Sequence, residues 1–139
     1  MLIESLAHIC RQYQIAILYA FGSRAKEAEA FAHGRIEQLA PSAADLDLGV
    51  LPANSRRMPI REKVDLTARL EDFFRVSRVD LVVLPESDPF LAANIIRGER
   101  LYADDETAAD EYDLYILRRA GDLIPLEKER LDLILEGSP

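Results

Sequence analysis

Short apolar runs alternate along the chain with segments in which apolar residues recur at helical spacing. Apolar runs of this length predict β-strands, and a spacing of three to four residues predicts amphipathic helices. The predicted strands cover residues 15–21, 45–51 and 79–84, with a short edge strand at 99–102. The predicted helices cover residues 2–13, 23–32, 60–74 and 89–98, followed by a mostly helical tail over 105–136 that is broken near Gly121 and Pro125.

The order of these elements indicates the fold class. Helices alternate with strands, which predicts an α/β (α+β) fold in which helices cover a small mixed sheet of three to four strands. The length of 139 residues is that of one ordinary domain, so we expect a single domain over 1–139 with C-terminal helices at about 105–136. Ser23 is expected to cap the second helix, and Pro89 to lie in the first turn of the fourth.

Composition and charge narrow the classes of function. The net charge of −8 argues against direct binding of nucleic acid but allows a nucleotide that is held through a metal ion. The hydrophobic fraction of 49% is typical of a globular protein, and the single Cys10 can form no internal disulfide. The sequence shows neither a signal peptide nor a membrane-spanning apolar stretch, so we expect a cytoplasmic protein that does not bind membranes.

Asp45 and Asp47 are the most informative polar pair. They lie two residues apart in a predicted strand, so both side chains project from one face, with Cα atoms about 6.6 Å apart. Two unshielded carboxylates at this separation repel each other, and Mg²⁺ is a natural ion to lie between them and substrate phosphates. The alternative is a solvated strand face, although Asp is uncommon in strands.

Asp80 adds a third carboxylate, inside an otherwise apolar predicted strand. A charge at such a position must be paired or lie at an edge or end of the sheet. Asp80 would serve as a metal ligand or accept the proton of an attacking hydroxyl. The alternative is a salt bridge to Arg75 or Arg78.

The sequence FGSRA leads from the first predicted strand into a helix. Exposed backbone N–H groups at Gly22 and Ser23 would hold a phosphate there, and Arg24 would neutralise triphosphate oxygens unless it lies on a solvated helix face. A phosphate-binding turn with three carboxylates contains the parts needed for metal-assisted transfer from a nucleoside triphosphate.

The segments FGSRA, DLDLGV, VDLVVL and IIRGERLY, between about residues 14 and 102, occur in the order seen in a known family. In this order they resemble the minimal nucleotidyltransferases of the DNA polymerase β superfamily. The resemblance implies that family's fold, with Gly22 and Ser23 on the phosphates, Asp45 and Asp47 on Mg²⁺, and Asp80 as ligand or base. The implied reaction is attack of an acceptor hydroxyl on the α-phosphorus of ATP, with release of pyrophosphate.

The same resemblance implies a partner protein. Stand-alone members of the family commonly act as antitoxins beside a HEPN-type ribonuclease toxin, with which they form a hetero-oligomer. The implied enzyme is a protein adenylyltransferase that transfers AMP to a tyrosine of that toxin. A competing hypothesis is a binding module that keeps the fold but neutralises its partner by occlusion. Transfer to a small molecule such as an aminoglycoside is disfavoured, because the chain is too short for the extra domain that such enzymes use.

Two further segments carry open alternatives. The connection over residues 24–44 is longer than the family usually has, and it would extend a helix, form a lid, contact a partner or mark a weakened site. The tail contains apolar stripes that would pack on their own domain or dock a partner protein. These stripes are Tyr112, Tyr115 and Ile116, and Leu131, Ile134 and Leu135.

Overall fold

The computed structural model describes the backbone of residues 2–136 and the side chains of residues 2–121. Within these residues four strands form one sheet in the order β3-β2-β1-β4. β2 runs antiparallel to β1 and parallel to β3, and β4 runs antiparallel to β1. The predicted mixed sheet is therefore confirmed. The strands are β1 (Ile15–Phe21), β2 (Leu46–Pro52), β3 (Val79–Val83) and β4 (Glu99–Ala103).

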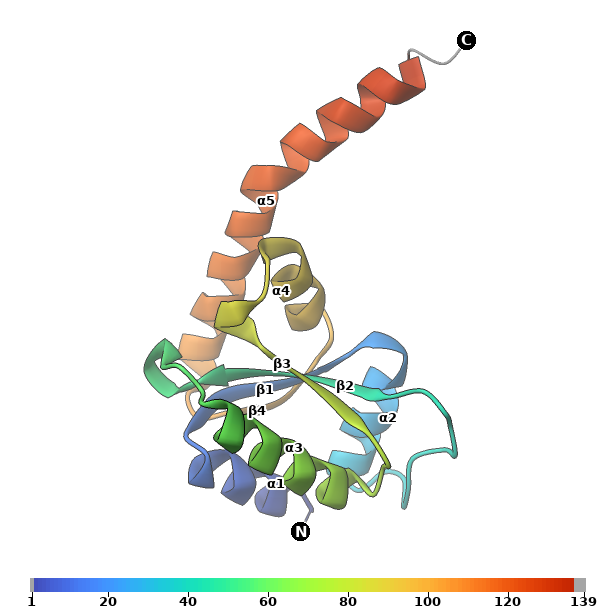
Figure 1. Ribbon diagram of the computed structural model, residues 1–139, viewed down its shortest axis with the longest axis vertical. Coiled ribbons are helices and arrows are strands. Elements are labelled where there is room, and N and C mark those ends of the chain that lie inside the picture. Colours follow the sequence, from blue (N-terminus) through green and yellow to red (C-terminus); the bar gives the residue numbers. More distant parts are fainter. Residues whose placement is uncertain (1, 137–139) are drawn as a thin grey trace.

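The helices divide between the two faces of the sheet. α1, α2 and α3 lie on one face, and α4 and the first part of α5 lie on the other (Figure 1). Short 3₁₀ turns follow the ends of three strands. The helices are α1 (Leu2–Gln12), α2 (Ala25–Ala32), α3 (Ile60–Phe74), α4 (Pro89–Ile96) and α5 (Glu106–Glu136), and the turns are η1 (Gly22–Arg24), η2 (Ala53–Ser55) and η3 (Leu84–Glu86).

Each face of the sheet has its own apolar core. Alternate residues of β2, including Leu46 and Leu48, join the cluster that packs against α1–α3. Leu51 projects from the opposite face and joins Tyr19 and Ile95 in the cluster beneath α4 and α5. Because side chains alternate between faces along a strand, the core residues of β2 fix which face its polar residues occupy.

The ends of α4 follow local rules that the sequence contains. Asp88 is the N-cap, and its carboxylate accepts hydrogen bonds from the backbone N–H groups of Phe90 and Leu91, both at 2.9 Å. Pro89 occupies the first turn, as predicted. Ser23 is not a cap, because the chain first tightens into η1 and α2 begins only at Ala25.

The C-terminal tail forms one long helix. α5 continues through Gly121 and Pro125, so the predicted break is wrong, and its ribbon bends along its length instead (Figure 1). The beginning of α5 is tied to β4 through Arg100, which pairs with Glu106, Asp110 and Asp113. These contacts hold the beginning of α5 against the sheet.

The described side chains of α5 show how the first of the two predicted apolar stripes packs. Ile116 is buried against α4, whereas Tyr115 and Leu117 are exposed. The first predicted stripe therefore packs partly on its own domain. The second stripe, Leu131, Ile134 and Leu135, lies outside the residues whose side chains are described. Among the described residues no helix is long and apolar enough to cross a membrane.

Gly98 offers a test of the packing between α4 and β4. A Cβ atom at Gly98 would lie 2.2 Å from the carbonyl oxygen of Ala20 and 3.0 Å from the Cα of Phe21. Both are backbone atoms, so no side-chain rotation relieves the clash. We expect Gly98→Ala to lower the free energy of unfolding by about 1–3 kcal/mol, measured by urea denaturation.

Gly121→Ala is the matched control, because nothing lies within 4 Å of a Cβ atom at that position. In a helix this change is expected to be neutral or stabilising by up to about 1 kcal/mol. Equal stability of the two variants would contradict the described contact between Gly98 and the end of β1.

Candidate active site

The turn after β1 is in direct contact with a carboxylate of β2. Gly22 has a φ of +74°, a conformation that favours glycine, and a Cβ atom there would lie 2.5 Å from the Oδ2 of Asp47. Gly22 is therefore required both by the backbone conformation and by the approach of Asp47. Ser23, the next residue of the turn, is exposed to solvent.

The register of the sheet aligns the turn with two of the predicted site residues. Phe21, at the end of β1, pairs with Asp47, and Asp47 pairs with Asp80 of β3. Neighbouring strands lie about 4.8 Å apart, so these residues form a short row across three strands. The order across this row is Gly22, Asp47 and then Asp80.

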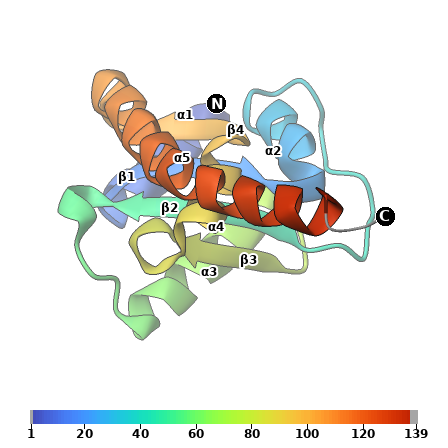
Figure 2. The ribbon, with the colours of Figure 1, turned by 90° about the horizontal axis from the view of Figure 1, so that it is seen from above.

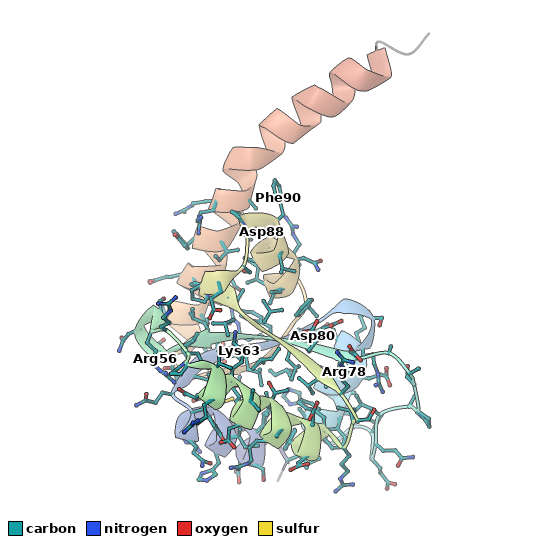
Figure 3. The ribbon with its side chains drawn as sticks, in the orientation of Figure 1. Arg56, Lys63, Arg78, Asp80, Asp88 and Phe90 are labelled. Atoms are coloured by element: carbon teal, nitrogen blue, oxygen red, sulfur yellow. The ribbon has the colours of Figure 1, made fainter. Side chains whose placement is uncertain are left out.

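The three carboxylates project from one face of the sheet. Leu46 and Leu48 are buried against α1–α3, so Asp45 and Asp47 project from the opposite face. On β3, Val79 is likewise buried against α1–α3, which places the neighbouring Asp80 on the same face as the other two. Figure 3 labels Asp80 on β3.

The carboxylates of Asp45, Asp47 and Asp80 are close enough to repel one another. The pKa of Asp47 is raised above its ordinary value, mainly by burial and then by the nearby carboxylates of Asp80 and Asp45. A raised pKa means that the ionised form of Asp47 is destabilised in the folded protein. The site would therefore gain stability from a bound cation.

Asp45 lies immediately before β2 and has a cationic neighbour. The guanidinium of Arg78 lies 3.5 Å from the Asp45 carboxylate, and the Arg78 side chain is 77% exposed. An ion pair this exposed contributes little to stability. One alternative from the sequence was a salt bridge between Asp80 and Arg78. Among the described residues, Arg78 instead forms an ion pair with Asp45.

A pocket of about 450 Å³ opens beside the Gly22–Ser23 turn. Its lining includes the turn, Lys26 at the beginning of α2, and Asn94 and Arg97 from the end of α4. Sequence reasoning did not assign Asn94 or Arg97 to the site. The segment IIRGERLY, already part of the recognised pattern, was the signal that pointed to this region.

Arg24 links the η1 turn to the long connection over residues 33–45. Its side chain is buried and donates hydrogen bonds to the carbonyl oxygens of Ala40, at 2.7 Å, and Ala44, at 3.2 Å. Glu27 also pairs with Arg24 and accepts a hydrogen bond from the backbone N–H of Ala40. The structure therefore favours a structural role for Arg24 over the predicted contact with nucleotide phosphates.

The long connection that Arg24 holds does not extend a helix. α2 ends at Ala32, and residues 33–45 run through turns and bends to the beginning of β2. Leu39 is buried in the core on the α1–α3 side, with Ile36 partly buried against it. The connection is thus packed onto the domain, and it delivers the chain to Asp45. Its roles as a lid or a partner contact stay predictions.

Comparison with known proteins decides the family. The profile described as Polymerase beta, Nucleotidyltransferase matches residues 4–107, which is most of the chain and includes every predicted site residue. The chain belongs to this nucleotidyltransferase family. Among curated protein sequences, no significant match to it was found.

Solved structures share the fold of this nucleotidyltransferase over nearly its whole length. A mutant MntA–HpeT toxin–antitoxin matches with a TM-score of 0.69 and 15% identity, covering 96% of this chain and 98% of the other. A toxin–antitoxin with AMP-PNP matches with a TM-score of 0.66 and 15% identity, covering 96% and 98%. A tri-AMPylated Shewanella oneidensis HEPN toxin in complex with an MNT antitoxin matches with a TM-score of 0.65 and 15% identity, covering 96% of each chain. These matches confirm the fold.

The carboxylates of this nucleotidyltransferase are suited to a magnesium ion whose other ligands come from water and a substrate. Among the side chains that the structure describes, no three His, Cys, Asp or Glu residues are already grouped closely enough to hold a metal ion by themselves. Mg²⁺ commonly uses only one or two protein carboxylates, with water and substrate phosphates as its other ligands. Asp45 and Asp47 could supply these one or two carboxylates, and a bound cation would offset the repulsion of Asp47 by its neighbours.

Asp47→Asn tests whether charge repulsion is built into the site. Because the pKa of Asp47 is higher in the folded than in the unfolded protein, its contribution destabilises the fold above about pH 4 and vanishes below that value. We therefore expect the variant to have a higher free energy of unfolding than the wild type at about pH 7 in EDTA, a gain that shrinks toward about pH 4. Urea denaturation across this range measures it.

The control is Asp72→Asn, which removes an exposed carboxylate from α3. We expect it to leave the pH dependence close to that of the wild type. A lower stability of Asp47→Asn than of the wild type at neutral pH would contradict the repulsion.

Proposed function

We propose that this nucleotidyltransferase transfers AMP from ATP to a hydroxyl of a partner protein and thereby acts as an antitoxin. The observation that carries the proposal is the row formed by Gly22, Asp47 and Asp80 across three neighbouring strands. A phosphate-binding turn next to carboxylates is the arrangement that metal-assisted transfer from a nucleoside triphosphate requires.

Each residue of the row has a proposed role. The backbone N–H groups at Gly22 and Ser23 bind triphosphate oxygens at the beginning of the η1 turn, which leads into α2. Asp45 and Asp47 hold Mg²⁺, which when bound neutralises the triphosphate and polarises the α-phosphate. Asp80, on the β3 side and farthest from the turn, is available to the acceptor as general base or further ligand.

The proposed reaction is a displacement at the α-phosphorus of ATP. The acceptor oxygen forms a bond to the α-phosphorus, the bond from that phosphorus to the bridging oxygen breaks, and pyrophosphate leaves. The hydroxyl proton passes to the Asp80 carboxylate. Arg97 and Lys26 line the neighbouring pocket and would offset the negative charge of the departing phosphates.

The proposed partner is a HEPN-type toxin, modified on a tyrosine. Support comes from the full-length structural likeness to toxin–antitoxin complexes, one with AMP-PNP and one with a tri-AMPylated HEPN toxin. Exposed apolar side chains on α4 and α5, Phe90, Leu114 and Tyr115, are suited to contact with a partner protein. These same side chains support the second candidate, a binding module that neutralises its partner by occlusion.

Co-expression with the protein encoded by the adjacent gene tests the proposal. We expect the intact mass of that protein to rise by one or more AMP residues with the wild type. The double variant Asp45→Asn, Asp47→Asn is expected to give no mass gain, because it removes the carboxylates proposed to hold Mg²⁺. Mass spectrometry of the isolated partner, followed by peptide mapping, identifies the acceptor residue.

The control is Asp72→Asn with Asp104→Asn, which removes the same number of charges at exposed positions on other parts of the domain. This control should modify the partner as the wild type does. Full neutralisation of the partner by the double variant at 45 and 47, with no mass gain in any sample, would establish occlusion instead.

A further inference from the structure

β3, the strand that carries Asp80, lies at an edge of the sheet. The strand order is β3-β2-β1-β4, so among the described strands β3 pairs with β2 alone (Figure 2). Leu81 is only partly buried, whereas Leu48, its partner in β2, is buried. Val82 and its partner Gly49 differ in the same way. The outer side of β3 is therefore accessible.

The backbone groups of β3 face alternately toward β2 and away from it. The N–H of Leu46 in β2 donates to the carbonyl oxygen of Arg78, at 3.1 Å, so the backbone of Arg78 faces β2. In a parallel pair every second residue directs its N–H and C=O groups to the neighbouring strand. Asp80 therefore also faces β2, and Leu81 directs its N–H and C=O groups to the outer side.

The outer side of β3 offers backbone groups for a further strand. At its beginning, the N–H of Val79 is already bonded to the carboxylate of Glu71, at 2.9 Å. The described part of the chain offers Leu81 no hydrogen-bond partner on this side, and Val83 continues the same series. Free donors and acceptors along a strand edge are a template for pairing with another chain.

The two edges of the sheet differ in how they are protected. Charged residues on an edge strand discourage pairing with other chains. β4 begins with Glu99 and Arg100, and Arg100 also ties this strand to α5. β3 contains one charged residue, Asp80, which belongs to the candidate active site. The less protected edge is thus the one beside the carboxylates.

An additional strand along β3 would deliver a side chain to the active site. The residue paired with Asp80 would have its Cα about 4.8 Å from that of Asp80, and its side chain would project from the face that carries the carboxylates. Asp47 lies one strand farther, roughly 9.6 Å from that residue. A short serine side chain would reach Asp80 only. A tyrosine side chain is long enough to extend past Asp80 toward Asp47.

We propose that the acceptor segment of the partner protein binds as an extended strand along the outer edge of β3, with its tyrosine opposite Asp80. The inference rests on the proposed function and adds how the acceptor is recognised. Main-chain hydrogen bonds to Leu81 hold the segment in register. A helical segment does not fit, because its backbone groups are already bonded within the helix. The edge only positions the acceptor, and the bonds made and broken are those of the proposed reaction.

Amide hydrogen exchange tests the position of the acceptor without any substitution. The isotope-labelled wild type is measured by NMR, alone and with its unlabelled partner, and nucleotide is left out so that no transfer occurs. We expect the partner to slow exchange of the Leu81 amide at least about tenfold. The Val82 amide, which faces β2, serves as the internal control and should change little.

Leu81→Pro is the decisive variant, because proline removes an N–H group that takes no part in pairing with β2. Transfer of AMP to the partner is expected to slow at least about tenfold, with the affinity for Mg²⁺ and ATP unchanged. Leu81→Ala is the matched control, since it shortens the same side chain but keeps the N–H. It should transfer AMP at close to the wild-type rate, measured by time-resolved intact mass.

The outcomes separate this inference from the proposed function. Wild-type transfer by a folded Leu81→Pro, equal losses in Leu81→Pro and Leu81→Ala, or unchanged exchange of the Leu81 amide in the complex would each overturn the inference. Should Leu81→Pro fail to fold, the exchange measurement decides. Slowed exchange at Leu81 with no transfer by the wild type would overturn the proposed function alone.

Discussion

The position of β2 between β1 and β3 is the constraint on which the rest of the site depends. Its pairing with both neighbours places Asp47 opposite the end of β1 and opposite Asp80. A slip of one residue would turn Asp47 toward α1–α3 and move Leu46 and Leu48 out of the core. Burial of these leucines therefore fixes the register, and the register fixes the active-site row.

The uneven covering of the sheet explains why this row is accessible. Seen from above, α4 and α5 lie over the sheet (Figure 2). In the part of the face that they cover, Leu51 is buried and the side chain of Ile95 packs against Gly49. The other end of the sheet carries Asp47 next to Gly22 and opposite Asp80. In the proposed reaction a bound cation would offset the repulsion between Asp47 and its neighbouring carboxylates.

Periodicity predicted most of the fold because local signals agreed with tertiary packing. The bounds of β1 and α3 were predicted to the residue. The misses depended on contacts that no local pattern contains. Ser23 follows the 3₁₀ geometry of η1, Arg24 binds carbonyl oxygens of a distant connection, and Arg97 reaches the turn only through the packing of α4. The metal and phosphate roles of the site residues stay predictions.

The most direct test of the central claim locates the metal–nucleotide complex on the domain. Mn²⁺ with AMP-PNP would be added to the isotope-labelled protein, and paramagnetic broadening of backbone amide signals would be mapped by NMR. Our account predicts the strongest broadening at Gly22, Ser23 and the residues beside Asp47 and Asp80, and none of it in Asp47→Asn. Broadening centred elsewhere, or equal broadening in that variant, would contradict the claim that these three strands build the nucleotide site.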